Sequence, residues 1–437
     1  MEQNKKMKVA MICHFSDTQI RSKLPLSKMR FTNFMMKLAG QRPFVYGDYA
    51  KWITSIAAQC YRFPTMEMHI IAPMFGLKTN EFSVEKDMVN YHIIKNRPSY
   101  LMQGFNRRLL SNRYVNYSSN YKRIQKVVRA INPDIVVLVG AENPCYSGSV
   151  LNLDGFPIYL MCQTVFDNEE FKQFYRKEEF ELRRSIESKI LKKTPYVGVN
   201  SKKYYDLLRV NGFEGNIFFF DWPSSITIPQ FAMKEKQFDF INFANSMSRQ
   251  KGYHDSVKAL AIVKKKYPKV RLALVNNGPM STQKELETLI TDLHLEDNIK
   301  FVPFFPDQQD LFNFLDVVRF GVLPCKLDNL SGTMLQCLSR GIPIVVYKTT
   351  GTPSLNDKHQ CALIAEMNDV DGLANHMLSL LDDNALAERL RLNAIKYMHE
   401  YLLGKQSCMD NIVENFKAII NNYKEGVAIP KQMLCNF

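Results

Sequence analysis

Residues 324–346 read PCKLDNLSGTMLQCLSRGIPIVV, and the pattern of this stretch decides the fold class. The stretch follows an apolar run at 317–323 and ends in a second one at 342–346, both short enough to be buried strands. Between them, Ser331 opens a helical pattern that Gly341 ends. A strand, a loop, a short helix and a second strand in this order predict a βαβ unit with parallel strands.

The same alternation extends outward in both directions. Runs rich in Val, Ile and Phe predict strands in the second half at 239–243, 270–275, 298–302, 317–323, 342–346 and 361–364, with helices near 256–266, 282–293 and 333–340. In the first half they predict strands at 8–13, 68–72, 91–94, 135–139, 157–161, 196–199 and 216–220. Apolar runs separated by helical patterns are typical of parallel strands covered on both faces. The predicted fold class is α/β, with two Rossmann-like doubly wound domains.

Two breaks in this pattern suggest the domain organisation. Residues 221–237 include Trp222, Pro223 and Pro229 and follow neither period, so we expect an N-terminal domain at 1–222 and a C-terminal domain at 223–404. The end of the chain, 405–437, contains an amphipathic helical pattern. We expect that helix to pack back on the N-terminal domain.

Length and composition fit two globular domains. The chain has 437 residues, of which 46% are hydrophobic and 23% charged, and these shares exclude collagen-like and disordered classes. The nine cysteines form no C-x-x-C pair, so we expect reduced thiols rather than zinc clusters or a disulfide framework. No apolar run approaches the roughly 18 to 20 residues of a membrane-spanning helix, and the first run is too short for a signal peptide. We therefore expect a cytoplasmic protein.

The formal net charge of +14 is concentrated in the first half of the chain. Residues 1–230 hold 33 Lys and Arg against 20 Asp and Glu, whereas residues 231–437 hold 24 against 23. This asymmetry indicates an anionic partner for the first half, and nucleic acid, a phospholipid surface and a phosphorylated substrate all remain open.

The predicted helix start at Ser331, Gly332 and Thr333 is a candidate anion site. Its first N–H groups have no partner within the helix, and the positive end of the helix dipole lies there, so a phosphate would bind well. Asp328 precedes the helix and Gln336 lies one turn in, where both could hydrogen-bond sugar hydroxyls. Taken alone, these residues also fit an ordinary capped helix of the core.

This segment resembles the signature of the retaining nucleotide-sugar glycosyltransferases of family 4, which have the GT-B fold, two Rossmann-like domains facing a central cleft. In that family a Glu-x(7)-Glu element opens the helix, followed by a small residue, Gly, Pro and an apolar run. Asp328 stands here at the first Glu and Gln336 at the second. The resemblance implies that Asp328 contacts the donor sugar, that Gln336 holds the ribose and that the N–H groups between them bind the diphosphate.

A second stretch carries the same resemblance. Residues 242–252 read NFANSMSRQKG and are similar to the strand and Gly-Arg-Leu-x-x-x-Lys-Gly turn of the family. Lys251 falls on the lysine that neutralises the donor diphosphate, a role that needs no metal ion. The family arginine is replaced by Ser246, with Arg249 as a substitute three residues on, and Gly278 lies in a run similar to the family's Gly-x-Gly-Pro. Without the resemblance, Lys251 and Arg249 read as solvated loop charges.

In the first domain the candidates follow predicted strands, at the edge where α/β proteins bind ligands. His14 follows the first strand, and Glu142 and Asn143 follow the strand at 135–139, where they could meet an acceptor hydroxyl. Gln163 stands where the resemblance implies a cleft histidine. The alternatives are a hydrogen-bonded loop histidine and a surface loop acid.

Basic and aromatic residues interleave between Phe105 and Arg129. Such a stretch could lie on an anionic bilayer or bind a lipid diphosphate, and a solvated helix face is the alternative. No RNP, zinc-finger or helix-turn-helix signature accompanies it, so we expect no nucleic-acid partner.

Together these features favour a retaining, hexosyltransferase-like enzyme with a nucleotide-diphosphate sugar as donor and with no metal or other cofactor. The resemblance implies front-face attack rather than a covalent intermediate. We expect the acceptor to be a lipid-linked glycan in capsule, exopolysaccharide or O-antigen assembly, at the inner face of the cytoplasmic membrane. The alternative is a non-catalytic nucleotide-sugar or partner-binding protein, because four residues depart from the family: Gln163, Ser246, Asp328 and Gln336.

Overall fold

The computed structural model describes residues 6–109, 116–172, 175–224, 226–229, 234–244, 246–276, 278–326 and 330–435. The chain divides into two compact units. The first comprises Met1–Met35, Gly47–Ser225 and Lys405–Phe437, and the second comprises Met36–Tyr46 and Ile226–Gly404. The described residues of 221–237 form neither helix nor strand.

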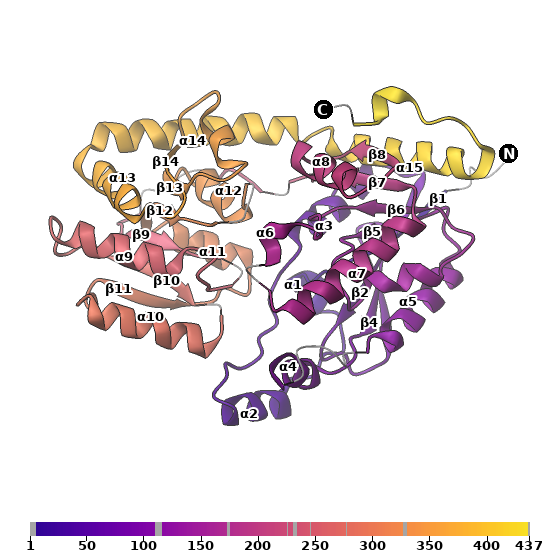
Figure 1. Cartoon of the computed structure of the whole chain (residues 1–437), viewed down its shortest axis with the longest axis horizontal. Helices are drawn as coiled ribbons and strands as arrows, with labels where there is room; N and C mark the ends of the chain where they lie inside the picture. The colour runs from indigo at the N-terminus through magenta and orange to yellow at the C-terminus, as the bar shows by residue number, and fades with distance from the viewer. Residues whose placement is uncertain are drawn as a thin grey trace. The chain divides into compact units, whose positions relative to one another are not determined.

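The described part of the first unit contains an eight-stranded sheet of order β3-β4-β2-β1-β5-β6-β7-β8 (Figure 1). Its strands are β1 (Met7–Ile12), β2 (Met66–Met74), β3 (Glu81–Lys86), β4 (Val89–Lys95), β5 (Ile135–Val139), β6 (Ile158–Met161), β7 (Tyr196–Val199) and β8 (Asn216–Phe219). The α-helices are α1 (Thr18–Arg21), α3 (Lys51–Ala57), α4 (Tyr100–Leu109), α5 (Ser118–Ile131), α6 (Glu169–Lys172), α7 (Lys177–Lys193), α8 (Lys202–Val210) and α15 (Cys408–Glu425). Helix α2 (Arg30–Leu38) begins in the first unit, and its residues from Met36 onward belong to the second. Short 3₁₀ helices lie at Cys60–Arg62, Ser147–Asn152 and Lys431–Met433.

Alternate residues of β1 face two hydrophobic cores. Val9 and Met11 lie in one core with α3 and α15, whereas Ala10 and Ile12 lie in the other with α5. This double burial explains why the parallel strands read as continuous apolar runs. Helix α15 contributes five buried side chains to the first core, from Met409, Ile412, Val413, Phe416 and Ile419.

Strand β3 is absent from the strands that the sequence analysis predicts. It pairs antiparallel with β4 at the edge of the sheet, and its residues alternate between exposed and half-buried. An edge strand with one solvated face lacks the continuous apolar run by which the other strands are found.

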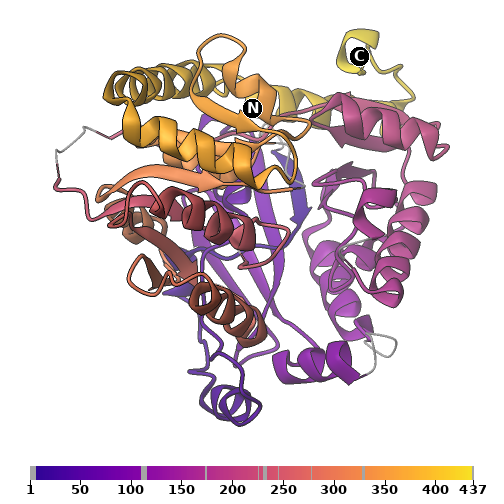
Figure 2. The same ribbon diagram turned by 60° about the vertical axis from the view of Figure 1, so that its left-hand side comes forward.

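The described part of the second unit contains a six-stranded parallel sheet of order β11-β10-β9-β12-β13-β14. Its strands are β9 (Phe238–Asn242), β10 (Leu272–Asn276), β11 (Ile299–Pro303), β12 (Val318–Leu323), β13 (Ile344–Tyr347) and β14 (Ala362–Ala365). The helices are α9 (Tyr253–Lys264), α10 (Met280–Asp292), α11 (Gln308–Leu315), α12 (Gly332–Ser339), α13 (Val370–Asp382) and α14 (Asn384–Gly404), with a 3₁₀ helix at Thr352–Asn356. Figures 1 and 2 show helices on both faces of this sheet.

The strand order of the second unit is that of the doubly wound dinucleotide-binding sheet, 3-2-1-4-5-6 in chain order. The order reverses between β9 and β12, and ligands of such sheets bind at the carboxyl ends of the strands on either side of that reversal. The predicted α/β class with two Rossmann-like domains is confirmed. Within the described residues, no helix has the length and apolarity needed to span a bilayer.

Candidate functional site

Two loops touch at the point where the second sheet reverses its order. Gly252, at φ 73°, ends the loop after β9, and a Cβ atom there would stand 2.2 Å from the carbonyl oxygen of Pro324 in the loop after β12. The backbone N–H of Lys326 donates to the carbonyl oxygen of Gln250 at 3.0 Å. Glycine is therefore required at 252 for both its positive φ and its close approach.

The loop after β10 lies at the same edge of the sheet as the loops after β9 and β12. A Cβ atom on Gly278 would stand 2.8 Å from the carbonyl oxygen of Met247, so this loop also lies against the loop after β9. Ser246, the residue at the family arginine position, is exposed in that loop. The carboxyl ends of β9, β10 and β12 thus form one continuous edge.

Lys251 lies on this edge, half-buried, directly before Gly252, the N-cap of α9. Its backbone N–H donates to Ser248 Oγ at 3.2 Å, and its Nζ stands 3.5 Å from Cys325 Sγ in the loop that leads toward α12. The alternative of a solvated loop charge does not describe Lys251, because its ammonium group is held against a neighbouring loop.

A second lysine at this edge is absent from the sequence predictions. Lys326 forms an ion pair with Asp255 of α9 at 2.9 Å, and the Tyr347 hydroxyl donates to the same carboxylate at 3.1 Å. No spacing pattern marks Lys326 or Asp255, because the pair joins residues far apart in the chain. This ion pair ties α9 to the loop after β12 and so helps to hold Lys251 in place.

Helix α12 begins with an open N-terminus. Ser331 caps it by accepting a hydrogen bond from the Met334 N–H at 3.4 Å, and its Oγ is bonded to Thr333 Oγ1 at 2.8 Å. Gly332 is exposed, and a Cβ atom there would meet nothing within 4 Å. No described residue accepts a hydrogen bond from the N–H of Gly332 or Thr333. These two donors can therefore bind an anionic group.

The other predicted site residues of the second unit are Asp328, Gln336 and Arg249. Asp328 lies outside the described residues. Gln336 is half-buried in α12. Arg249 forms an exposed ion pair with Glu285 of α10 at 3.0 Å. The structure thus pairs the Arg249 side chain with α10.

In the first unit, Glu142 follows β5 and is buried. Its Oε1 accepts from Asn143 Nδ2 at 2.9 Å, while its Oε2 is buried without a hydrogen-bond partner among the described residues. The Gln163 amide, oriented with its nitrogen toward Glu142, donates to Oε1 at 3.2 Å and accepts from Trp52 Nε1 at 3.1 Å. Burial raises the pKa of Glu142, and nearby Arg183 opposes that rise.

The structure brings Glu142, Asn143 and Gln163 together and adds Trp52, which no sequence pattern indicates. The alternative of a surface loop acid at 142 is wrong, because the side chain is enclosed. His14 is exposed after β1, the neighbour of β5 in the sheet, and its ring stacks on Tyr49 with the centroids 4.1 Å apart.

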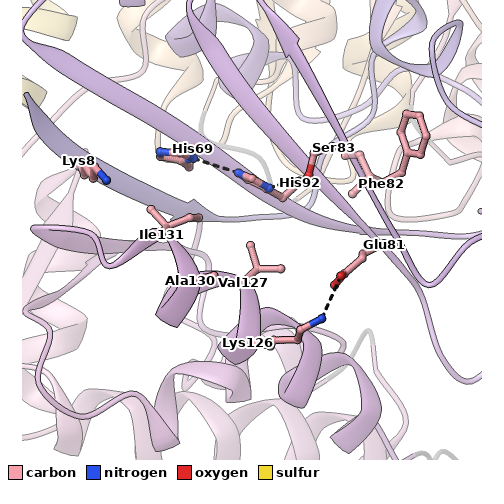
Figure 3. Close-up of a pocket in the computed structure, with 11 residues that line it drawn as sticks. Lys8, His69, Glu81, Phe82, Ser83, His92, Lys126, Val127, Ala130 and Ile131 are labelled. Atoms are coloured by element: carbon pink, nitrogen blue, oxygen red, sulfur yellow. Dashed lines mark hydrogen bonds and ion pairs between the residues drawn. The ribbon is translucent and has the colours of Figure 1, made fainter.

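A cavity of about 540 Å³ lies elsewhere in the first unit, between α5 and β1 to β4 (Figure 3). A chain of hydrogen bonds runs along its sheet side: Ser83 Oγ to His92 Nδ1 at 3.0 Å, His92 Nε2 to His69 Nδ1 at 3.0 Å, and His69 Nε2 to Glu67 Oε1 at 2.9 Å. With both imidazoles neutral, each group donates to the next toward the carboxylate. These groups satisfy one another, so the cavity does not add to the candidate site.

Two Rossmann-like units in one chain are the components of the GT-B fold. Solved structures that are similar to this one support the same fold. Sucrose-phosphate synthase from Thermosynechococcus elongatus superposes with a TM-score of 0.66 at 12% identity, covering 94% of this chain and 98% of that one. HepE from Anabaena, solved in complex with UDP and glucose, gives 0.63 at 14% identity, covering 93% and 99%. At these identities the likeness establishes the fold.

Sequence comparison adds a family match in the second unit. Residues 225–397 match the model described as Glycosyl transferases group 1. The lipopolysaccharide core biosynthesis glycosyltransferase LpsE of Rhizobium meliloti (strain 1021) is 27% identical over 158 residues, which cover 36% of this chain and 43% of LpsE. The chain therefore spans less than half the length of this relative. The matched family segment contains Lys251 and α12.

Proposed function

We propose that this protein is a retaining glycosyltransferase that moves a sugar from a nucleotide-diphosphate sugar to an acceptor. The observation that carries the proposal is the position of Lys251 at the reversal of strand order, against Cys325 in the loop toward α12. The family match over 225–397 supports glycosyl transfer, and the solved complex of HepE with UDP and glucose supports a nucleotide-sugar donor.

The proposed chemistry needs positive charge beside the leaving diphosphate. The bond between the anomeric carbon and the diphosphate oxygen breaks while the acceptor oxygen bonds to that carbon on the same face, and the acceptor proton passes to the leaving phosphate. The Lys251 ammonium group and the N–H groups of Gly332 and Thr333 would stabilise the negative charge that develops on the diphosphate. These groups perform the task without a metal ion. Gln336 and Asp328 would bind the ribose and the donor sugar.

The acceptor is proposed to bind at the carboxyl edge of the first sheet. Glu142 supports this, because its buried Oε2 has no partner among the described residues and could accept a bond from an acceptor hydroxyl. The lipopolysaccharide function in the name of LpsE supports a glycan acceptor. The positive excess of residues 1–230 supports an acceptor carried on a lipid diphosphate.

The test combines nucleotide binding with turnover. We expect UDP or GDP, from a panel that includes ADP and CMP, to raise the melting temperature by mass action. Lys251→Ala should lower the rate of donor turnover by about 100- to 1000-fold, the effect of removing one preorganised charge partner. Lys258→Ala, an exposed lysine on α9, is the matched control and should keep the wild-type rate.

Two outcomes would decide against this proposal. A Lys251→Ala rate equal to that of the wild type would remove Lys251 from the mechanism. Nucleotide binding without turnover of any donor, even with lipid extract added, would instead favour a non-catalytic nucleotide-sugar-binding protein.

A further inference from the structure

Between β1 and α3 the chain makes a long excursion that carries α2 at its tip (Figures 1 and 2). The base of the excursion is fixed on the first unit. Ser16 and Tyr49 pair in an isolated antiparallel bridge, and Arg21 forms a buried ion pair with Asp48 at 2.7 Å. The base of the excursion is therefore held by contacts that do not involve the exposed face of α2.

The exposed face of α2 is apolar. Phe31, Phe34 and Leu38 are 71%, 59% and 67% exposed, and Met35 is 39% exposed. These residues stand at i, i+3, i+4 and i+7, so their side chains share one face of the helix. Helix α2 has no buried residue.

The opposite face of α2 carries its uncharged polar residues. Thr32 and Asn33 are half-buried, together with Met36. A helix on a water-exposed surface normally turns its polar residues outward and its apolar residues toward the protein. Helix α2 is turned the other way, which indicates that its outer face meets an apolar phase.

The charge around α2 identifies that phase. Residues 18–47 contain six Lys and Arg residues and no Asp or Glu. Arg21 and Arg42 are engaged within the chain, since Arg42 donates to the carbonyl oxygen of Asn276 at 2.9 Å. Lys28, Arg30 and Lys37 are exposed. Large apolar side chains flanked by exposed cations are the pattern of helices that lie in the interface of an anionic bilayer.

We propose that α2 binds an anionic lipid bilayer, with Phe31, Phe34, Met35 and Leu38 inserted at the boundary of headgroups and acyl chains. Lys28, Arg30 and Lys37 then lie among the anionic headgroups. This inference goes beyond the proposed function and does not depend on it. A protein attached in this way would meet a lipid-linked acceptor at the membrane surface.

The stretch from Phe105 to Arg129, whose sequence also fits an anionic bilayer, a lipid diphosphate or a solvated helix face, is a weaker candidate. Residues 110–115 lie outside the described residues, as do the side chains of 105–109. Arg123 donates to the carbonyl oxygen of Lys95 at 3.2 Å and Arg129 to that of Asn152 at 3.0 Å, while Lys126 forms an ion pair with Glu81 at 3.1 Å. Arg123, Lys126 and Arg129 thus bind their own unit, while Lys122 is exposed.

The test is sedimentation of the full chain with vesicles. We expect the wild-type protein to sediment with phosphatidylcholine vesicles that contain phosphatidylglycerol, and much less with pure phosphatidylcholine. The variant with Phe31→Ser, Phe34→Ser and Leu38→Ser should lose at least about tenfold in affinity for the anionic vesicles, because its inserted area is removed. The variant with Lys28→Gln, Arg30→Gln and Lys37→Gln should lose the preference for phosphatidylglycerol.

A matched control separates α2 from apolar exposure in general. Val210→Ser with Leu403→Ser removes two apolar side chains of similar exposure on other helices and should bind as the wild type does. Circular dichroism and the melting temperature verify folding of each variant. The nucleotide-induced rise in melting temperature should persist in all of them, which keeps this test separate from that of the proposed function.

Three results would overturn the inference. The first is a wild-type protein that does not sediment with anionic vesicles. The second is a serine variant that binds these vesicles as tightly as the wild type does. The third is a wild-type dimer in light scattering that the serine substitutions dissociate while vesicle binding is absent, which would make a second copy of the chain the occupant of this face.

Discussion

At the residue scale, substitution of Gly332 tests the proposed donor site without changing any charge. Alanine would fit the folded chain, because a Cβ atom there meets nothing within 4 Å, and alanine favours helices by up to about 1 kcal/mol over glycine. The added methyl group would, however, stand at the helix start where we propose that the diphosphate binds. We expect Gly332→Ala to keep or slightly raise the melting temperature of the nucleotide-free protein. It should weaken nucleotide binding about tenfold, which corresponds to about 1.4 kcal/mol.

Calorimetric titration and thermal melts measure these two opposite effects. Gly404→Ala, at another glycine whose Cβ position meets nothing within 4 Å, is the matched control and should change neither quantity greatly. A lower melting temperature of nucleotide-free Gly332→Ala would mean that the substitution disturbs α12 itself. An unchanged affinity would exclude this helix start from the donor site.

At the element scale, the histidines of β2 and β4 make the first unit sensitive to acid. His69 and His92 lie diagonally on adjacent strands, since His92 is opposite Ile71, and Ser83 is opposite His92 on β3. Burial lowers the pKa of His69 and lowers that of His92 to about 4, and the positive charge of His69 contributes to the second shift. Both imidazoles are therefore neutral in the folded protein at neutral pH.

The folded-state pKa values lie below the value of about 6.5 expected in the unfolded chain. As the pH falls from about 6.5 toward 4, the unfolded chain takes up protons that the folded protein does not, so stability decreases. For His92 the loss is at most about 3 kcal/mol, since one pKa unit corresponds to about 1.4 kcal/mol and partial exposure reduces the effect. His92→Gln should show a shallower decrease of stability over this range than the wild type.

Urea unfolding at a series of pH values measures this difference. Both tryptophans of the chain, Trp52 and Trp222, belong to the first unit, so tryptophan fluorescence follows the unfolding of that unit. His399→Gln removes an exposed histidine of α14 in the second unit and should keep the wild-type profile. An equal decrease of stability with falling pH in His92→Gln and the wild type would show that His92 does not cause the acid sensitivity.

At the scale of the whole molecule, the end of the chain completes the core of the first unit. Phe416 of α15 is fully buried and packs edge-to-face on Tyr159, with ring centroids 6.1 Å apart. Phe416→Ala should destabilise the first unit by about 3–5 kcal/mol, the range for large-to-small substitutions in a core. Tyr423→Ala removes an exposed aromatic side chain from the same helix and should cost about 0.5 kcal/mol or less.

Urea unfolding followed by tryptophan fluorescence also measures this effect. The nucleotide-induced stabilisation of the second unit should survive in Phe416→Ala, because the second unit has its own cores. An unchanged unfolding midpoint would show that α15 contributes nothing to the first unit.

Much of the fold could be predicted because the signals that specify it are local. The strand at 135–139 agrees with β5 residue for residue, and the helix expected at 333–340 lies one residue from α12. A strand buried on both faces needs a continuous apolar run, and a helix start needs its cap and its dipole, so both leave a short-range pattern in the chain. Ser331 was identified as a helix start for the same reason, whereas Lys251 was identified from the resemblance of 242–252 to a family motif.

The properties that depend on distant contacts could not be predicted from the chain alone. Arg249 pairs with Glu285, Lys326 pairs with Asp255, and Glu142 is enclosed rather than exposed. Each result depends on which loops meet after folding, and side-chain type and spacing do not encode that meeting. Helix α2 is the clearest case. Its apolar spacing can be read in the sequence, yet an amphipathic pattern is the same whether the apolar face points inward or outward, and only packing of the whole chain decides between them.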